Sequence, residues 1–172
     1  MTDAWPSKKE YEAALRNINL RLESLAARAG STMAKARAYG TADQSGIPAN
    51  VITKVNLNAE SYDPGSNFDI VNYKFVAPVA GYYSVAYAIQ WGSTLVGGVY
   101  VAHCYVNGAE VSANVLHAYL ANNLSPLGAD IIYLAVNDYV ELYGSHWVVA
   151  GNSTISANSA KTWLAIHLLS GV

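Results

Sequence analysis

The stretch from Tyr73 to Trp91 limits the fold of this chain more than any other part of the sequence. A short β-type run ends before Pro78, and Gly81 precedes a longer run, 82–91, in which small and aromatic residues alternate. Proline cannot donate to a sheet ladder and glycine frees the backbone, so we expect a sharp break between two strands. The stretch therefore predicts a short strand, a turn and one long strand.

Residues alternate in character with a period of two from residue 36 to the end, interrupted by Gly, Asn and Pro. This alternation predicts an all-β body. Asn107-Gly108 favours a tight hairpin, and Asn137-Asp138 suggests a similar turn. Many short strands without a helical insert are typical of a β-sandwich or jelly roll. We expect strands near 36–40, 51–57, 72–76, 82–91, 98–106, 109–117, 129–136, 138–148 and 161–169.

The front of the chain has the pattern of one helix. Ser7 and Glu10 fit a capping box, and Gly30 is expected to end the helix. The sequence then divides into a helix with a short hinge, residues 1–35, and a β domain, residues 36–172. Apolar residues recur along the helix at the alternating spacings of three and four that define a coiled coil, at Tyr11, Leu15, Ile18, Leu22, Leu25 and Ala29.

A helix of three heptads has only marginal stability in water by itself, so partner helices or an oligomeric body must hold the coil together. Leu at the a positions with Ile at a d position favours three or more strands over two. The alternative is an amphipathic helix that packs onto its own domain or onto a host structure.

Composition favours a folded, oligomeric protein. Hydrophobic residues make up 52% of the chain and charged residues 13%, which excludes a disordered chain and leaves little charge to cover a monomer. Subunit contacts that hide apolar surface would explain this shortage, although the 13 tyrosines can also cover surface. The basic residues of segment 1–40 outnumber its acids by three, and this excess is weak evidence for nucleic-acid binding. With no apolar run of about 20 residues and no signal-peptide pattern, we expect synthesis in the cytoplasm and no membrane insertion.

The residues that could carry catalysis or bind metal form no known pattern. The single cysteine, Cys104, cannot form an internal disulfide and is expected to be buried. His103 beside it faces the opposite side of a strand, so the two cannot chelate one ion together. Four acids are expected in turns: Asp63, Asp69, Asp130 and Asp138. Carboxylates in turns usually cap the backbone and, less often, bind calcium. The sequence therefore predicts no enzyme and no cofactor.

Aromatic residues are the remaining candidates for a binding site. Trp91, Tyr143 and Trp147 are candidates for a platform on which a sugar or flat apolar ligand could stack. Aromatic residues also favour strands and fill sandwich cores, which is the competing interpretation. His146 either lines a surface pocket beside Trp147 or has a structural role.

Several motifs resemble the globular head of complement C1q and the wider tumour necrosis factor-like jelly rolls. The resemblance lies in the stretch 73–91, the segment Tyr62–Asp69, the run Asp130–Leu142 and the last strand, 162–169, and covers about residues 36–170. Asn137 stands where that family usually has glycine, and the Phe-x-Gly of its last strand is absent. The resemblance implies a C1q/TNF-like jelly-roll β-sandwich that forms a homotrimer and binds other molecules without catalysis.

Residues 36–57 are similar to bacteriophage versions of this head, which occur on capsids and at the ends of tail proteins. This resemblance implies a virion protein, either a spike or decoration protein anchored by its N-terminal helix segment or a tail-fibre tip. The implied partners are a major capsid or tail protein and, for a fibre tip, a glycan or protein on the host surface.

Overall fold

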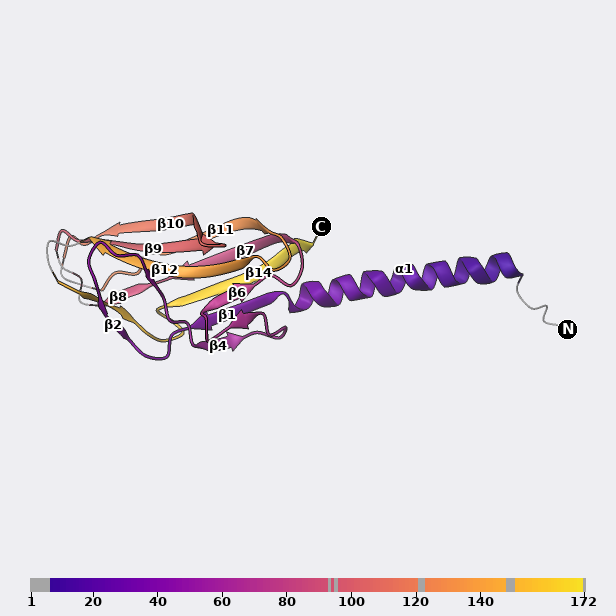
Figure 1. Cartoon of the computed structure of the whole chain (residues 1–172), viewed down its shortest axis with the longest axis horizontal. Coiled ribbons are helices and arrows are strands. Elements are labelled where there is room, and N and C mark those ends of the chain that lie inside the picture. Colours follow the sequence, from indigo (N-terminus) through magenta and orange to yellow (C-terminus); the bar gives the residue numbers. More distant parts are fainter. Residues whose placement is uncertain (1–6, 93, 95, 121–122, 148–150, 172) are drawn as a thin grey trace.

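The structure is a computed structural model that describes residues 7–92, 94, 96–120, 123–147 and 151–171, without the side chains of 27–33. One helix, α1 (Lys8–Met33), extends from one end of an elongated β-sandwich, nearly in line with it (Figure 1). The expectation of an all-β body behind a single helix is confirmed. No helix in the described part of the chain is long and apolar enough to span a bilayer.

The capping box at the start of α1 is confirmed. Ser7 Oγ accepts a hydrogen bond from Glu10 N at 3.3 Å, and Glu10 Oε2 accepts from Ser7 N at 2.7 Å. The Ser7 hydroxyl and backbone amide lower the pKa of the Glu10 carboxyl. The predicted stop at Gly30 and the hinge after it are wrong, because α1 continues to Met33 and the first strand begins at Lys35.

Two sheets form the sandwich and a third closes the end away from α1 (Figure 1). Sheet I has the strand order β11 (Leu127–Leu134), β7 (Gly81–Ala88), β14 (Trp163–Gly171), β1 (Lys35–Tyr39) and β4 (Ala59–Tyr62). Sheet II has the order β10 (Ala109–His117), β9 (Val99–Val106), β12 (Tyr139–Trp147), β6 (Lys74–Val76) and β5 (Phe68–Asp69), and β3 (Thr53–Lys54) also pairs with β12. Sheet III has the order β2 (Gln44–Ile47), β13 (Ser153–Ser156) and β8 (Gln90–Gly92).

The core lies between sheets I and II. Strand β7 contributes Tyr83, Val85 and Tyr87 to it, and all three are fully buried. Cys104 lies in the same core as expected, and its burial raises the pKa of the thiol to about 12. Further core residues come from both sheets, including Ala36, Phe75, Leu142, Leu164 and Ile166.

The stretch 73–91 contains one more break than predicted. The expected long strand ends at Ala88, and the chain then leaves sheet I to form β8 in sheet III. Gly81 is needed for space, because a Cβ there would lie 2.3 Å from the Ser170 carbonyl oxygen across the β7–β14 pair. The predicted reason, backbone freedom, is wrong, since Gly81 does not have a positive φ.

The two turns predicted from asparagine have different roles. Asn107 and Gly108 have φ of 51° and 80°, and they join β9 to β10 in the predicted tight hairpin. Asn137 also has a positive φ, of 70°. It does not close a hairpin, however, because β11 belongs to sheet I and β12 to sheet II.

Candidate oligomerisation surface

The side of sheet I that points away from the core is largely apolar, and no other layer of the described residues lies on it. In β7, core residues alternate with Tyr82, Ser84 and Ala86, which point outward. The strand register places outward residues of β11, β14 and β1 beside them. We call this surface the open face; it comprises Lys35, Arg37, Tyr39, Tyr82, Ser84, Ala86, Leu127, Ala129, Ile131, Tyr133, Trp163, Ala165 and His167.

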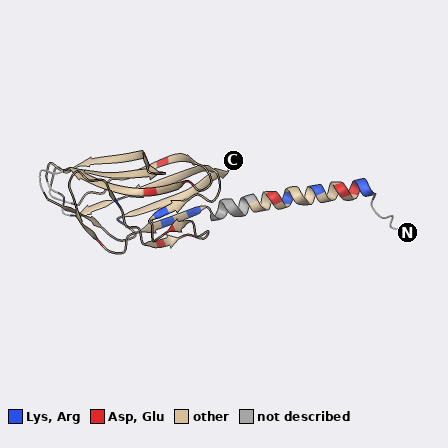
Figure 2. Cartoon of the chain, in the orientation of Figure 1, with Lys and Arg blue, Asp and Glu red and all other residues tan. Residues whose placement is uncertain are grey.

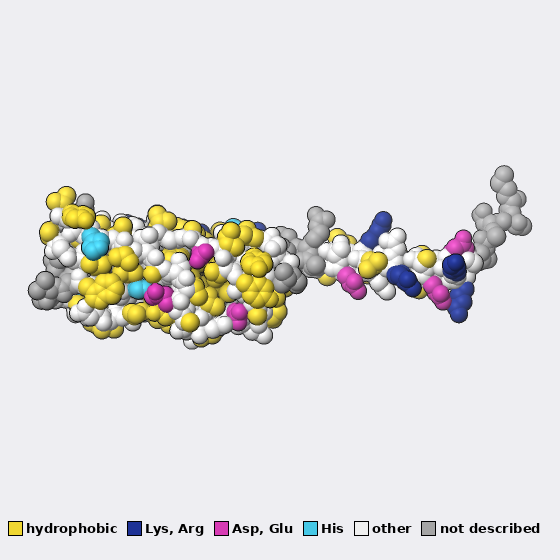
Figure 3. Space-filling model, turned by 90° about the horizontal axis from the view of Figure 1, so that it is seen from above, with side chains coloured by type: hydrophobic (Ala, Val, Ile, Leu, Met, Phe, Trp, Pro, Cys, Tyr) yellow, Lys and Arg dark blue, Asp and Glu magenta, His cyan; other side chains and the backbone are white. Residues whose placement is uncertain are grey.

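Large apolar side chains of the open face are exposed to solvent. Ile131 is 61% exposed, Tyr133 51% and Tyr82 48%. The rings of Tyr82 and Tyr133 contact each other edge to face, with centroids 5.6 Å apart. The edge of the sandwich along β10 and β11, seen in Figure 3, is mixed, with hydrophobic side chains among acidic and uncharged polar ones. Large apolar side chains gathered on one exposed face mark an interaction site in a soluble protein.

Charge is confined to one margin of the open face. The outward residues of β7, β11 and β14 include no Asp, Glu, Lys or Arg, and this statement covers only strands that the structure describes. Lys35 and Arg37 lie on β1, towards the β4 edge. Arg37 is held there, since it lies 4.9 Å from the ring centre of Trp163 and donates to Ser61 Oγ at 2.9 Å.

The predicted coil residues are also exposed in the single chain. Tyr11, Leu15, Ile18, Leu22 and Leu25 all lie on α1 without cover from the sandwich, which excludes packing of the described helix face, residues 8–26, on its own domain. The side chain of Ala29 lies outside the described residues. Self-association of the helix and docking on a host structure both remain predictions.

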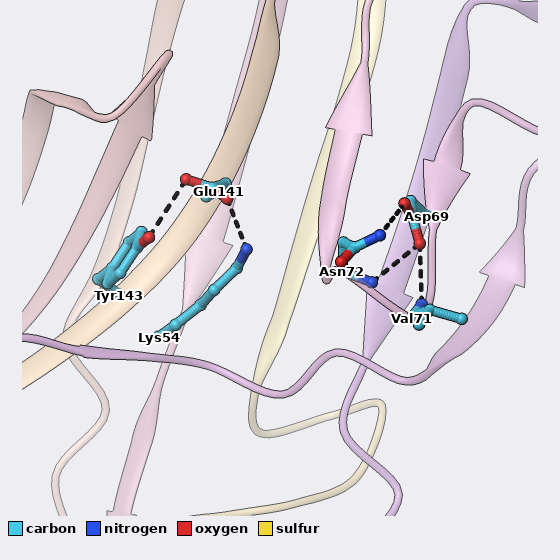
Figure 4. A network of polar contacts seen from close by, with 6 residues as sticks. All are labelled: Lys54, Asp69, Val71, Asn72, Glu141 and Tyr143. Carbon is cyan, nitrogen blue, oxygen red and sulfur yellow. Dashed lines mark hydrogen bonds and ion pairs between the residues drawn. The ribbon is translucent and has the colours of Figure 1, made fainter.

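The outer side of sheet II differs because its polar groups find partners within the chain. Glu141 is largely buried, yet its carboxylate contacts Lys54 Nζ at 2.5 Å and accepts from the Tyr143 hydroxyl at 3.2 Å (Figure 4). Burial and the nearby Glu141 carboxylate raise the pKa of Tyr143. The rings of Tyr105 and Tyr143 pack with centroids 4.6 Å apart.

A second polar cluster on sheet II has the hydrogen-bond order of a Ser-His-carboxylate triad. Ser145 Oγ lies 2.8 Å from His103 Nε2, and Glu110 Oε2 lies 2.7 Å from His103 Nδ1. A nucleophile must be reachable by its substrate, and Ser145 is only 1% exposed. The cluster therefore joins β9, β10 and β12 and offers no surface on which a substrate could meet the hydroxyl.

The predicted aromatic platform is not assembled. Trp91 is fully buried in contact with Tyr100 and His146, so its inclusion in the platform is wrong. Tyr143 is half-buried on sheet II, and Trp147 is exposed near the end away from α1. Of the alternatives for His146, the structural role is confirmed, because this residue is buried and its Nε2 contacts the Ile47 carbonyl oxygen at 2.9 Å.

Asp63, Asp69 and Asp138 accept backbone amides in turns as expected, whereas Asp130 lies within strand β11, so its predicted place in a turn is wrong. Asp69 accepts from the amides of Val71 and Asn72 and from the Asn72 side chain, and this last bond is the main cause of its lowered pKa (Figure 4). Asp63 accepts from Phe68 N at 2.7 Å. Among the residues that the structure describes, no group of three or more His, Cys, Asp or Glu could hold a metal ion.

Sequence comparisons identify no relative: no protein-family model and no curated protein matches the chain. Solved structures do match. Eiger TNF from S. frugiperda has a TM-score of 0.62 and 12% identity, covering 80% of this chain and 93% of that one. The globular domain of zebrafish complement 1qA has a TM-score of 0.55 and 11% identity, covering 80% and 98%.

Murine APRIL at pH 5.0 also matches, with a TM-score of 0.60, 12% identity, and coverage of 78% of this chain and 98% of that one. These identities show the fold and nothing more specific. The described sandwich, with two packed sheets and one N-terminal helix, therefore has the C1q/TNF-like jelly-roll fold.

Proposed function

We propose that the protein is a non-enzymatic homotrimer that displays its jelly-roll domain on a larger assembly through the N-terminal helix. The open face is the observation that carries this proposal. A monomer would leave its apolar strands in water, whereas contact between copies would bury them at roughly 25 cal/mol per Å². The C1q/TNF-like fold supports the proposal, because a homotrimer is typical of domains with this fold.

The helix supports the same arrangement. It projects from one end of the sandwich, and its apolar residues are exposed there (Figure 1). In a trimer three such helices start from the same end of three neighbouring domains. They would be held close enough to form the coil predicted from the heptads, which compensates for their short length.

The larger assembly that we propose is a bacteriophage virion. The protein would be a spike or decoration protein on the capsid, with residues 1–35 in contact with a major capsid or tail protein. Support for this step comes from the resemblance of residues 36–57 to phage forms of the head. The protein would be made in the host cytoplasm and assembled onto the particle.

Sedimentation of the full chain at micromolar concentration tests the trimer. We expect a species three times the chain mass of 18.4 kDa. A chain truncated before Met33 should remain folded and trimeric, because the open face is intact without the coil. A compact 18.4 kDa species for the full chain would overturn the proposal.

Binding of the purified protein to assembled particles tests the anchoring role. The full chain should bind particles that lack it, and the truncated chain should not. Equal binding by both would show that residues 1–32 are not the anchor, even if the trimer is confirmed.

A second candidate function, recognition of an uncharged ligand such as a host-surface glycan, is favoured by the end of the sandwich away from α1. The segments 44–53, 89–109, 111–129 and 142–160 contain no Asp, Glu, Lys or Arg. Charged residues gather on α1 and towards the helix end of the sandwich (Figure 2). Exposed Val96, Tyr119, Leu120 and Trp147 lie in or next to the loops of the other end. Loss of host-cell attachment in Trp147→Ala and Tyr119→Ala would support this function, and attachment unchanged in both would reject it.

A further inference from the structure

A cavity of about 580 Å³ opens at the helix end of sheet I, on the β4 margin of the open face. It is lined by Lys35, Tyr62, Asp63, Pro64 and His167. The Tyr62 hydroxyl and His167 Nε2 are hydrogen-bonded, and their rings meet edge to face at 5.6 Å. Asp63 Oδ1 is buried and has no hydrogen-bond partner among the described residues. The cavity therefore has an aromatic wall that a hydrogen bond holds in place.

The opposite margin of the same face carries an exposed aromatic pair. Tyr133 lies on β11, the edge strand of sheet I, and Tyr82 lies next to it on β7. Both are about half exposed, and their edge-to-face contact holds them as a unit. Tyr82 faces Ser170 in the register and Lys35 faces His167, so the aromatic pair and the cavity lie towards the same end of the sheet.

A closed ring requires contact between two different patches of the chain. In a threefold ring each subunit meets its two neighbours through two different surfaces, and rotation without translation keeps those surfaces at one height. If the open faces surround the axis, the β11 margin of one copy meets the β4 margin of the next, because β11 and β4 are opposite edges of one sheet. The aromatic pair and the cavity meet both requirements, because they lie at the same height and on opposite margins of the sheet.

We propose that the Tyr82–Tyr133 pair of one copy inserts into the Lys35–Tyr62–Pro64–His167 cavity of the next copy. This inference rests on the proposed trimer and specifies how its copies pair. The tyrosine rings cover the apolar part of the cavity, and their hydroxyls meet a wall with polar groups at Tyr62, His167 and Lys35. Aromatic side chains that fill a pocket of the partner are typical of the residues that dominate interface energy.

Disulfide trapping in the full chain tests the pairing. The variants are Tyr133→Cys, Pro64→Cys and the double variant, each oxidised and separated without reductant. Within one chain the two positions lie on opposite edges, four strand spacings or roughly 19 Å apart, so they cannot bridge internally. Buried Cys104, with a thiol pKa of about 12, should not contribute. We expect linked species of two and three chains from the double variant alone.

The outcomes separate failure of the pairing from failure of the trimer. Cross-linking by Tyr133→Cys alone would show that this residue meets its own counterpart, which overturns the pairing. A trimeric mass without any cross-link also overturns the pairing and leaves the trimer intact. A monomeric wild-type chain overturns the trimer itself. If Pro64→Cys does not fold, Lys35→Cys replaces it, since Lys35 lines the same cavity.

Truncation of the aromatic pair gives a second measurement. We expect Tyr133→Ala to weaken association of the copies by roughly 30-fold, within the range for interface residues that fill pockets. Val111→Ala is the matched control, because Val111 is exposed on β10, outside the open face. Equal effects of the two substitutions would contradict the proposal.

Discussion

The outer sides of the two main sheets differ in the side chains that they expose to solvent. Sheet II pairs its buried polar groups within the chain, as Glu141 does with Lys54 and His103 with Glu110 and Ser145. Sheet I presents an apolar face whose outward residues on β7 and β14 have no charged group among the described positions. This difference indicates that sheet II is complete in one chain and that sheet I is not.

A charge placed on the open face should have the largest effect. Ala86 lies between Ala129 and Ala165 in the middle of that face, and Ala86→Arg would bury an unpaired guanidinium between copies. Because an uncompensated buried charge costs several kcal/mol, we expect association to weaken by at least about 100-fold. Sedimentation should show the 18.4 kDa chain in place of the trimer.

The matched control for Ala86→Arg is Val115→Arg, on exposed β10 of sheet II. This variant should sediment like the wild type. If both variants dissociate, or neither does, the two faces do not differ as proposed.

Breaking the ion pair on sheet II should reduce stability without changing the oligomer. In Lys54→Met the largely buried Glu141 carboxylate loses its charged partner. Loss of one member of a fully buried pair costs about 3–5 kcal/mol, and Lys54 is partly exposed, so we expect the free energy of unfolding to fall by about 2 kcal/mol. Denaturant titration measures this change. Recovery of stability in the double variant Lys54→Met/Glu141→Gln would attribute the loss to the unpaired carboxylate.

The core shared by both sheets should respond to alkaline pH. Burial raises the pKa of the Cys104 thiol from 9.0 to about 12, so the unfolded chain loses this proton at lower pH than the folded chain. The free energy of unfolding should therefore fall as the pH rises from about 9 towards 12. We expect this fall to be smaller in Cys104→Ala, measured by denaturant titration at each pH. An identical pH dependence in both chains would show that the thiol does not contribute.

Removal of a single hydroxyl should give the smallest effect. Tyr143→Phe deletes the hydrogen bond to Glu141 Oε2, at 3.2 Å, which is worth about 1 kcal/mol of stability. Tyr82→Phe is its counterpart on the open face, and should leave the stability of the isolated domain unchanged within about 0.5 kcal/mol. A larger loss in Tyr82→Phe than in Tyr143→Phe would contradict the view that sheet II holds the internal polar contacts.

Some elements were predictable because their signals are local. The capping box at Ser7 and Glu10, the Asn107-Gly108 hairpin and the backbone contacts of Asp69 each depend on residues a few positions apart. The short strands β2, β4, β5 and β13 were not predicted. They have two to four residues each, too few to show a clear period of two, and their position depends on partners distant in the sequence.

The break after Ala88 was missed for a similar reason. Alternation continues through Ile89 into Trp91, so nothing local marks the change of sheet. The break is set by distant contacts, in which Gln90 N donates to Thr162 Oγ1 at 3.1 Å and β8 pairs with β13. Trp91 is consequently buried at the end of the sandwich, which the composition of its own strand could not indicate.

The sequence alone determined the class of the fold, the helix with its apolar heptads, the burial of Cys104 and the shortage of surface charge. These follow from local periodicity, capping and composition. Only the tertiary structure decided which strand faces remain open, because alternation gives two faces to every strand and does not say which is covered. It also placed the cavity and the aromatic pair on opposite margins of one sheet, since that depends on strand order, and strand order is set by contacts between residues far apart in the chain.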